Sequence, residues 1–412
     1  MDLSLYIHIP FCRAKCAYCD FNSYAGRERL LEPYLAAVEG EIADLGARVA
    51  SYQPAVVPTV YFGGGTPSLL SLGQAETLLL AVRRSFPVRP DAEVTLEANP
   101  GTVSTGYLLG LRSLGVNRLS LGVQSLDDGL LQAVGRIHTA AQARQAYSWA
   151  RQAGFQNVSL DFMYGLPGQT LTQWQNTLQE ALALCPDHLS LYALTVDEDT
   201  PLGRRVATGE LAVPDADLAA DMYELAEEVL AKGGYQHYEI SNWAGDAERP
   251  WAPPTGSRCR HNLVYWRNEP YLGFGAGAHS SCPAVLARHL RPNLWSSGES
   301  GAPPVAWTRW RDALSPERYI ACLRSGRSPA EEAQELSAGD AMAETMFMGL
   351  RLVSEGVPMA GFAERFDRSM EEVFGTRIGE LVAAGLLESA GDRVRLTGRG
   401  RLLGNEVFQR FV

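Results

Sequence analysis

The 412-residue sequence lacks several features that would assign it to a particular class of protein. It has no apolar run that approaches the length needed to span a bilayer, and its first residues lack the basic and apolar segments of a secretory signal. It also lacks an excess of positive charge, since 47 acidic and 36 basic residues give a formal net charge of −11. Because nucleic-acid binding favours a basic surface, we expect no nucleic-acid partner.

The cysteines do not form the pattern of a disulfide framework. There are seven, an odd number, and three of them are clustered. This usage is typical of a reducing compartment, so we expect a cytoplasmic protein whose thiolates are available to metal. The hydrophobic content of 46% and charged content of 20% are ordinary for a globular chain, and the length suits one large and one smaller domain.

The three clustered cysteines are Cys12, Cys16 and Cys19, which follow a short apolar strand predicted over residues 3–9. Their C-x3-C-x2-C spacing lets one compact loop present three thiolates to a cubane iron–sulfur cluster, with one iron left open. An open position is where a ligand can bind to a metal. Zinc bound by these cysteines and His8 is a less favoured alternative, because no second pair of metal ligands accompanies His8.

Strands and helices are predicted to alternate six times along the first half of the chain. This alternation is typical of parallel strands joined by right-handed helical crossovers. Six units are too few for a closed eight-stranded barrel, so we predict an open, partial (β/α)6 TIM-like barrel, with a doubly wound sheet as the alternative. The strands are expected at residues 3–9, 56–62, 92–96, 118–121, 158–160 and 188–194, and the helices at 27–49, 69–86, 107–114, 140–153 and 171–184.

Glycine, carboxylate and amide groups follow these strands, where barrel enzymes assemble their sites. The glycine segment, residues 63–67 (GGGTP), allows the backbone to approach a ligand closely, although such a run is often only a tight turn. Glu97 can accept from a ligand ammonium or ribose hydroxyl, and Asp161 can bind ribose hydroxyls. Arg136 can clamp a carboxylate with two hydrogen bonds, and Gln124 can serve either kind of group.

The cysteine spacing, with Tyr18 before the last cysteine, resembles the signature of the radical S-adenosylmethionine (SAM) enzymes. The resemblance implies a [4Fe-4S] cluster on Cys12, Cys16 and Cys19, with SAM chelating the fourth iron. The wider string YIHIPFC-x3-C-x-YCDF is similar to one branch of that family, the oxygen-independent coproporphyrinogen III oxidases and the HemW-type haem chaperones. Matched to the family pattern, the residues lining the cofactor would be Tyr6, Tyr18, Gly64, Gly65, Thr66, Glu97, Gln124, Arg136, Asp161 and Thr195.

The rest of the chain suggests a second, smaller domain. Residues 197–228 carry ten acidic and two arginine side chains, which is typical of a solvated helix face. We predict that residues 1–295 hold the barrel and its extension, 296–315 a linker, and 316–412 a helical domain. Within it, helices are expected at residues 341–352, 360–366 and 370–384, followed by a hairpin near 393–397. That order resembles a winged helix, but residues 371–410 carry six acidic and six basic side chains and form no basic stripe.

A second constellation, CRHNLVYW at residues 259–266, combines a histidine with two aromatic side chains. A single histidine is more often structural than a ligand. However, HNxxYW is similar to a motif that marks the haem chaperones and is missing from the oxidases, which makes His261 the candidate haem ligand. Phe21 stands where the oxidases carry a further cysteine, and the sequence begins without their N-terminal extension.

These departures favour the chaperone branch. We therefore expect a protein that binds haem and delivers it to haem-requiring proteins such as respiratory enzymes, with peripheral membrane contact left open. The alternative is an oxygen-independent coproporphyrinogen III oxidase, so whether the protein is an enzyme stays open, and no catalytic residue is assigned. A radical enzyme that modifies tRNA is a third class, which the charge balance disfavours.

Overall fold

The computed structural model describes residues 1–212, 215–246, 256–295 and 305–412. Six parallel strands form the centre of its main sheet, and they are the six that the sequence predicts. The predicted α/β alternation is thus confirmed. The strands are β1 (Ser4–Ile9), β4 (Val57–Gly64), β5 (Val88–Ala98), β6 (Arg118–Gln124), β7 (Val158–Tyr164) and β8 (His188–Ala193).

The order of these strands identifies the sheet as a partial barrel. They run β1-β4-β5-β6-β7-β8, in chain order and without a reversal. A doubly wound sheet reverses its order at a switch point, so that alternative is excluded. The two outermost of the six do not pair with each other, because β1 pairs with β11 and β8 with β10. The six strands therefore make an open barrel wall.

Further strands extend this wall on both sides, and the sequence did not predict them. The sheet has 12 strands in the described part of the chain. Beside β1 lie β11 (Tyr271–Phe274), β12 (His279–Pro283), β13 (Val305–Asp312) and β14 (Ala330–Ser337), and beside β8 lie β10 (Asn242–Gly245) and β9 (Tyr235–Glu239). The short strands β2 (Phe11–Cys12) and β3 (Tyr24–Ala25) pair with each other within the cysteine loop.

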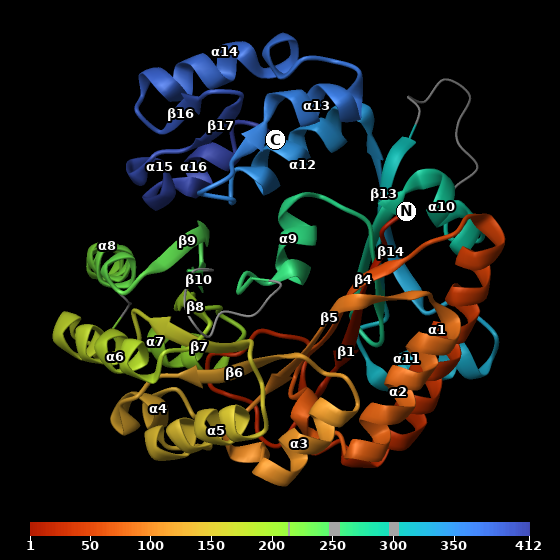
Figure 1. Cartoon of the computed structure of the whole chain (residues 1–412), viewed down its shortest axis with the longest axis horizontal. Helices are drawn as coiled ribbons and strands as arrows, with labels where there is room; N and C mark the ends of the chain where they lie inside the picture. The colour runs from red at the N-terminus through yellow and green to blue at the C-terminus, as the bar shows by residue number, and fades with distance from the viewer. Residues whose placement is uncertain (213–214, 247–255, 296–304) are drawn as a thin grey trace.

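Helices cover the outer face of the wall (Figure 1). Three of them begin with a capping box, in which a Ser or Thr and a Gln three residues later satisfy each other's backbone N–H groups: Ser71 starts α2, Thr139 starts α5 and Thr170 starts α6. The helix predicted over residues 171–184 matches α6 at both ends. The helices are α1 (Leu31–Tyr52), α2 (Leu72–Ser85), α3 (Thr105–Ser113), α4 (Asp128–Ala133), α5 (Ala140–Gln152) and α6 (Leu171–Leu184).

The two faces of each barrel strand have opposite chemistry. On β1, Leu5 and Ile7 are buried in the main hydrophobic core, which the outer helices complete. The alternate residue Tyr6 faces inward and stacks on Tyr61 of β4, with 6.1 Å between ring centroids. Successive side chains of a strand point to opposite faces, so the polar residues at the alternate positions line the barrel interior.

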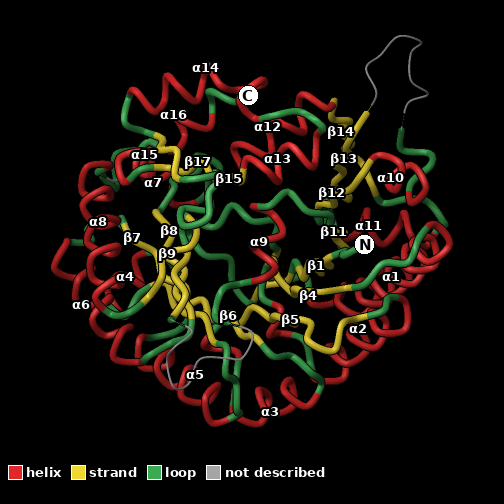
Figure 2. Tube along the Cα trace, turned by 45° about the horizontal axis from the view of Figure 1, so that its top comes forward, coloured by secondary structure: helices red, strands yellow, loops and turns green. Residues whose placement is uncertain are grey.

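The acidic stretch contains α7 (Pro201–Ala207) and α8 (Ala216–Lys232), and α8 buries Met222, Ala226 and Leu230. Beyond it, α9 (Arg260–Trp266) lies between the two arms of the curved sheet in both views (Figures 1 and 2). Helices α10 (Ala284–Leu290) and α11 (Pro316–Arg324) lie near α1. In the described part of the chain, no helix combines the length and hydropathy needed to cross a membrane.

The C-terminal helices pack around a second hydrophobic core that includes Met346, Phe362 and Phe374. The predicted helices and hairpin are present. They are α12 (Ala338–Gly349), α13 (Met359–Phe366), α14 (Met370–Ala383), α15 (Gly398–Leu402) and α16 (Gly404–Phe408), with a small sheet of β15 (Val357–Pro358), β17 (Arg393–Leu396) and β16 (Leu387–Ala390).

Two strands, β13 and β14, lie in a part of the chain for which the sequence predicts only a linker and helices. Residues 305–312 fall in the predicted linker and residues 330–337 in the predicted helical domain, yet both are strands of the main sheet. Much of β14 is exposed and carries Glu331, Glu332 and Glu335, so it has no alternating apolar pattern. Part of the predicted linker, residues 296–304, lies outside the described residues.

Candidate active site and haem-motif helix

The cysteine loop, residues 10–26, is held at the end of β1 by its own backbone. Tyr24 N donates to Pro10 O at 2.7 Å, and Cys19 N donates to Cys16 O at 3.2 Å. Cys12, Cys16 and Cys19 are all partly exposed and form no disulfide. The loop therefore presents three reduced thiols at the carboxyl end of the barrel strands.

Each cysteine sulfur has a polar neighbour from a different part of the site. Thr66 Oγ1 donates to Cys12 Sγ at 3.4 Å, Arg136 Nη1 donates to Cys16 Sγ at 3.4 Å, and Cys19 Sγ lies 3.8 Å from Ser23 Oγ. Burial raises the pKa of the Cys19 thiol. The glycine segment and Arg136, which lie far apart in the sequence, are thus brought to the cysteine loop.

The donor set fits a cluster better than a single metal ion. Among the described residues, no three or more His, Cys, Asp or Glu side chains converge on one ion position. His8 is engaged at both ring nitrogens, since Nε2 lies 2.9 Å from Asn22 O and Nδ1 lies 3.0 Å from Tyr6 Oη. It supplies no fourth ligand for zinc. A cubane cluster takes one thiolate on each of several irons, so its cysteines surround it without meeting at a point.

The glycine segment is shaped by its contact with the cysteine loop. Gly64 has φ +113°, and a Cβ there would lie 2.5 Å from the His8 ring. A Cβ on Gly65 would lie 2.8 Å from Phe11 O, and Gly65 N donates to Ile9 O at 2.9 Å. The glycines therefore allow close backbone packing beneath the cysteines, whatever further contact they make with a ligand.

Two carboxylates face the barrel interior beyond this segment. Glu97 accepts from Tyr61 Oη at 2.8 Å and from Gly64 N at 3.1 Å. Burial, with a smaller contribution from the charge of Asp161, raises the pKa of Glu97 to about 7 against the lowering effect of its hydrogen bonds. Asp161 accepts from the hydroxyls of Ser120 and Ser159, both at 2.8 Å, and burial raises its pKa as well.

Gln124 and Arg136 lie at the same end of the wall. Gln124 has φ +66°, a conformation rare outside glycine, at an irregularity in the pairing of β6 with β7. Arg136 Nη2 donates to Gly122 O at 2.6 Å, so this guanidinium is shared between the barrel wall and Cys16. Its Nε has no hydrogen-bond partner among the described residues. Arg136 is therefore placed both to neutralise thiolate charge and to offer a free donor.

The remaining predicted cofactor residues frame this interior. Tyr6 lies on the inner wall, and Tyr18 lies within the cysteine loop, where burial raises its pKa. Thr195 follows β8 and is exposed. The inner face is open to solvent here, since Tyr192 of β8 is 43% exposed.

The haem-motif helix α9 occupies the opposite end of the interior. Its first N–H groups are capped by Glu93, which accepts from Arg260 N at 3.1 Å and from His261 N at 3.0 Å. The His261 ring is buried and stacks on Tyr61, with 5.1 Å between centroids. Tyr61 therefore contacts both Glu97 and His261, and it joins the two ends of the interior.

The hydrogen bonds of His261 define its tautomer. Thr59 Oγ1 donates its only hydrogen to Ser4 Oγ, so it accepts from His261 Nδ1 at 2.7 Å. His261 Nε2 then carries the lone pair and accepts from Tyr265 Oη at 2.9 Å. Burial, together with the charge of Arg118, lowers the pKa of His261 to about 3, so the imidazole is neutral. Nε2 is therefore the nitrogen with a lone pair for a metal, and in this structure that lone pair accepts the hydrogen bond from Tyr265.

Several inward-facing residues that organise both ends were not predicted from the sequence, namely Tyr61, Thr59, Glu93, Arg118, Ser120 and Ser159. Each lies on a strand next to residues buried in the outer core, as in Arg118-Leu119-Ser120-Leu121 of β6 and Val158-Ser159-Leu160 of β7. The available signal was the recurrence of a polar residue at every second position of several strands.

Comparisons with known proteins show which family the chain resembles. Residues 6–181 match the model of the radical SAM superfamily, and residues 336–403 match that of the HemN C-terminal domain. The chain is 36% identical to the heme chaperone HemW of Bacillus subtilis, over 99% of both chains. It is also 36% identical to the heme chaperone HemW of Escherichia coli, over 100% of this chain and 98% of that protein.

A solved structure gives the same fold. The coproporphyrinogen III oxidase HemN of Escherichia coli, described as a radical SAM enzyme, superposes with a TM-score of 0.78 at 23% identity. The match covers 99% of this chain and 89% of that one. At this identity the likeness concerns the fold alone.

Proposed function

The chain belongs to the HemW family of radical SAM proteins, and from this membership we propose that it binds haem and delivers it to haem-requiring proteins. The observation that carries the proposal is the position of α9. Its HNxxYW motif places a neutral histidine against the same inner wall that leads to the cysteine loop. Phe21, which is 64% exposed, stands where the oxidases have a further cysteine, and it supports the chaperone branch over the oxidases.

The radical SAM family implies a [4Fe-4S] cluster and SAM, and we propose that Cys12, Cys16 and Cys19 hold the cluster. Such a cluster supplies an electron that can cleave bound SAM. This chain's own residues would orient the ligand: Glu97 and the glycine segment for its amino group, Asp161 and Gln124 for its ribose, and Arg136 for its carboxylate. Tyr6, Tyr18 and Thr195 would complete the surrounding wall. The orphan Nε of Arg136 and the solvent-open inner face are consistent with a ligand there.

For haem, we propose His261 as the iron ligand through Nε2. The neutral imidazole has no proton to lose before it binds a metal. Because Tyr265 now donates to Nε2, iron binding requires this hydroxyl to move or to donate elsewhere. We further propose that the protein acts in the cytoplasm, where its thiols stay reduced, and that its acceptors are haem proteins such as respiratory enzymes.

One preparation tests the proposal against its rival, a coproporphyrinogen III oxidase. The protein is reconstituted with iron and sulfide under anaerobic conditions, titrated with haem, and assayed for conversion of coproporphyrinogen III to protoporphyrinogen IX. We expect stoichiometric haem binding and no conversion. His261→Ala should weaken haem binding, whereas His279→Ala, at an exposed histidine, should not. Conversion without stoichiometric haem binding would overturn the proposal.

A further inference from the structure

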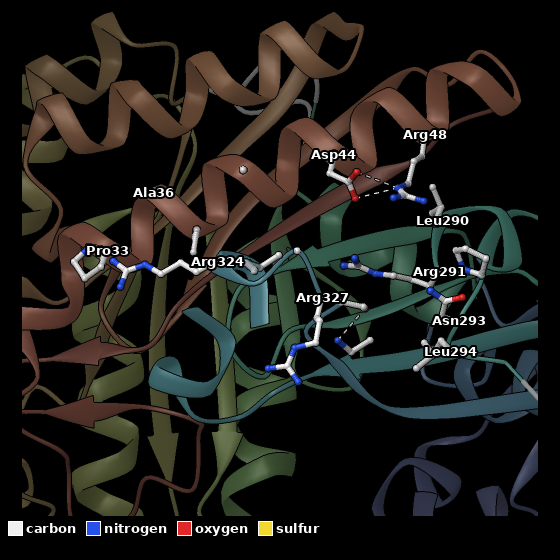
Figure 3. Close-up of a pocket in the computed structure, with 17 residues that line it drawn as sticks. Pro33, Ala36, Asp44, Arg48, Leu290, Arg291, Asn293, Leu294, Arg324 and Arg327 are labelled. Atoms are coloured by element: carbon white, nitrogen blue, oxygen red, sulfur yellow. Dashed lines mark hydrogen bonds and ion pairs between the residues drawn. The ribbon is translucent and has the colours of Figure 1, made fainter. Parts of the chain in front are cut away.

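A pocket on the outer side of the molecule, away from the barrel interior, has the features of a second binding site. It lies beneath α1, between the residues that follow α10 and those that follow α11, and its volume is about 710 Å³ (Figure 3). That volume is within the roughly 300–1,000 Å³ of small-molecule sites. On the α1 side, small residues make the space: Ala36, Ala37 and Gly40 line it. A Cβ added at Gly40 would meet nothing within 4 Å.

The pocket concentrates positive charge on a protein whose net charge is −11. Four arginines and one aspartate line it. Asp44 forms an ion pair with Arg48 at 3.0 Å, and the buried Glu41 forms one with Arg291, so the charges of these two arginines are balanced. Arg324 and Arg327 form no ion pair with any described residue, so the pocket keeps two unbalanced positive charges. A local charge opposite to that of the whole chain favours an anionic ligand.

One of these arginines is built into the fold. Arg291 is only 5% exposed, and its Nε has no hydrogen-bond partner among the described residues. Its other contacts hold it firmly, because Glu41 also accepts from Tyr319 Oη at 2.6 Å and from Gly275 N at 3.4 Å. Leaving a buried donor unpaired has a cost, and a ligand oxygen would remove it.

Apart from Asn293 and Ser328, the rest of the lining is small or apolar, and it has no common ligand of haem iron. Pro33, Leu290, Pro292, Leu294 and Leu323 contribute apolar surface, and the lining as described includes no His, Cys, Met or Tyr. The site can therefore contact an apolar body and bind its anionic groups, but it cannot coordinate iron through a usual side chain. Arginine forks suit carboxylates, which they bind with two parallel hydrogen bonds.

We propose that this pocket binds an amphipathic dicarboxylate through Arg324, Arg327 and Arg291, and that its ligand is the porphyrin of haem, held by its two propionates. This identification of the ligand rests on the proposed function. A porphyrin has a flat apolar body and two carboxylates, which match the lining and the two unbalanced charges. Held here, the iron remains without a protein ligand, which suits a site from which haem is passed on.

The test uses metal-free protoporphyrin IX, followed by its own fluorescence, on the full-length protein. Arg324→Glu with Arg327→Glu should weaken binding by about ten-fold or more, because two charge-assisted contacts become repulsive. Gly40→Phe should fill the pocket and abolish binding there. The matched control is Arg84→Glu with Arg368→Glu, which makes the same charge change at exposed arginines outside the lining and should leave binding unchanged.

Two further arms identify the recognised groups. The dimethyl ester of protoporphyrin IX should bind the parent protein much more weakly than the free acid, and inorganic phosphate should not displace the acid at equal concentration. Equal binding of acid and ester, displacement by phosphate, or unchanged binding in the Arg324/Arg327 variant would each overturn the inference. Because Arg324 and Arg327 are exposed, their substitution tests the inference even if Gly40→Phe does not fold.

The proposed function is measured separately, by the haem-iron spectrum in parent and His261→Ala proteins. If haem ligation is normal and the pocket variants bind porphyrin like the parent, the pocket proposal is wrong and the proposed haem chaperone function is unaffected. Absence of haem ligation in the parent would count against the proposed function, whatever the pocket binds.

Discussion

The two ends of the barrel interior carry comparable donors in very different states. At the cysteine end, three thiols are partly exposed, their sulfur contacts are 3.4–3.8 Å long, and Glu97 has a pKa of about 7. At the α9 end, His261 is buried, both its nitrogens have hydrogen bonds of 2.7–2.9 Å, and its pKa is about 3.

The difference implies that the cysteine end could bind its proposed ligands as it stands, whereas the α9 end would have to change its hydrogen bonds first. The cysteine end has free donor capacity and an opening to solvent, which suit the cluster and the small cofactor proposed for it. The His261 end is fully satisfied and closed, so the proposed haem ligation by His261 would require an existing hydrogen bond to be displaced. A satisfied buried polar group is rigid and specific, but a ligand has to compete with its partner. The predictions below test the two ends against each other.

The largest expected effect is at the cysteine end. Replacing Cys12, Cys16 and Cys19 together by Ala should abolish the broad visible absorption of the reconstituted protein and its cluster-bound iron, because no other described residues converge there as ligands. Haem binding through His261 should survive, since the two ends have separate donors. The control is Cys185→Ala with Cys322→Ala, at two cysteines outside the loop. A retained absorption band in the triple variant would mean that other groups hold the iron.

The second effect isolates the α9 end. His261→Ala should lower haem affinity by more than the roughly 10–100-fold that loss of a metal ligand's hydrogen-bonding partner costs, with iron content and cluster absorption unchanged. Haem titration followed in the Soret region measures it. An unchanged haem spectrum and affinity would refute the ligand assignment. A simultaneous loss of the cluster would mean that the two ends are not independent.

The third effect contrasts the pH dependence of the ends. Burial chiefly raises the pKa of Glu97 to about 7, with Asp161 adding to the shift and Tyr61, Gly64 and Arg118 opposing it. A cationic ligand favours the ionised carboxylate, so affinity rises with pH through 7. Between pH 6 and pH 8 the ionised fraction increases by about ten-fold.

Equilibrium dialysis of SAM against the reconstituted protein measures this change. Glu97→Gln serves as the control, because it removes the titration at Glu97 and keeps any titration of SAM itself. We expect the ratio of parent to variant affinity to rise by about ten-fold between pH 6 and pH 8. Haem affinity should show no step from His261 in this range, since its pKa is about 3. A ratio that stays flat with pH would show that Glu97 does not meet the cationic group.

How far each end could be predicted depends on how local its pattern is. The cysteine end is encoded within eight consecutive residues, and strand-end positions such as Glu97 and Asp161 follow from the alternation of elements, so sequence alone brought these residues together. The six barrel strands were predictable for the same reason. The flanking strands were not, because β11 and β10 have four residues each and β14 is an exposed, glutamate-rich strand.

The α9 end could not be assembled from sequence, because its contacts are long-range. Thr59 and His261 are 202 positions apart, and Glu93 caps a helix that begins 167 residues later. Neither contact is implied by a local period or a turn signal. His261 was identifiable from its motif, but the bonds that hold its two nitrogens depend on how α9 enters the curve of the sheet.

The smallest expected effect tests whether His261 is held closed. Tyr265→Phe removes the hydroxyl that donates to Nε2 and leaves the bond from Nδ1 to Thr59, so the lone pair needed by iron becomes free. Because a hydrogen bond contributes about 0.5–1.5 kcal/mol net, haem affinity should rise by roughly two- to ten-fold. The control is Tyr271→Phe, since the Tyr271 ring lies 4.7 Å from that of Tyr265 and its hydroxyl forms no hydrogen bond with His261. If haem affinity instead falls in Tyr265→Phe while the control is unchanged, then Tyr265 assists haem binding, and the α9 end is as ready for its ligand as the cysteine end.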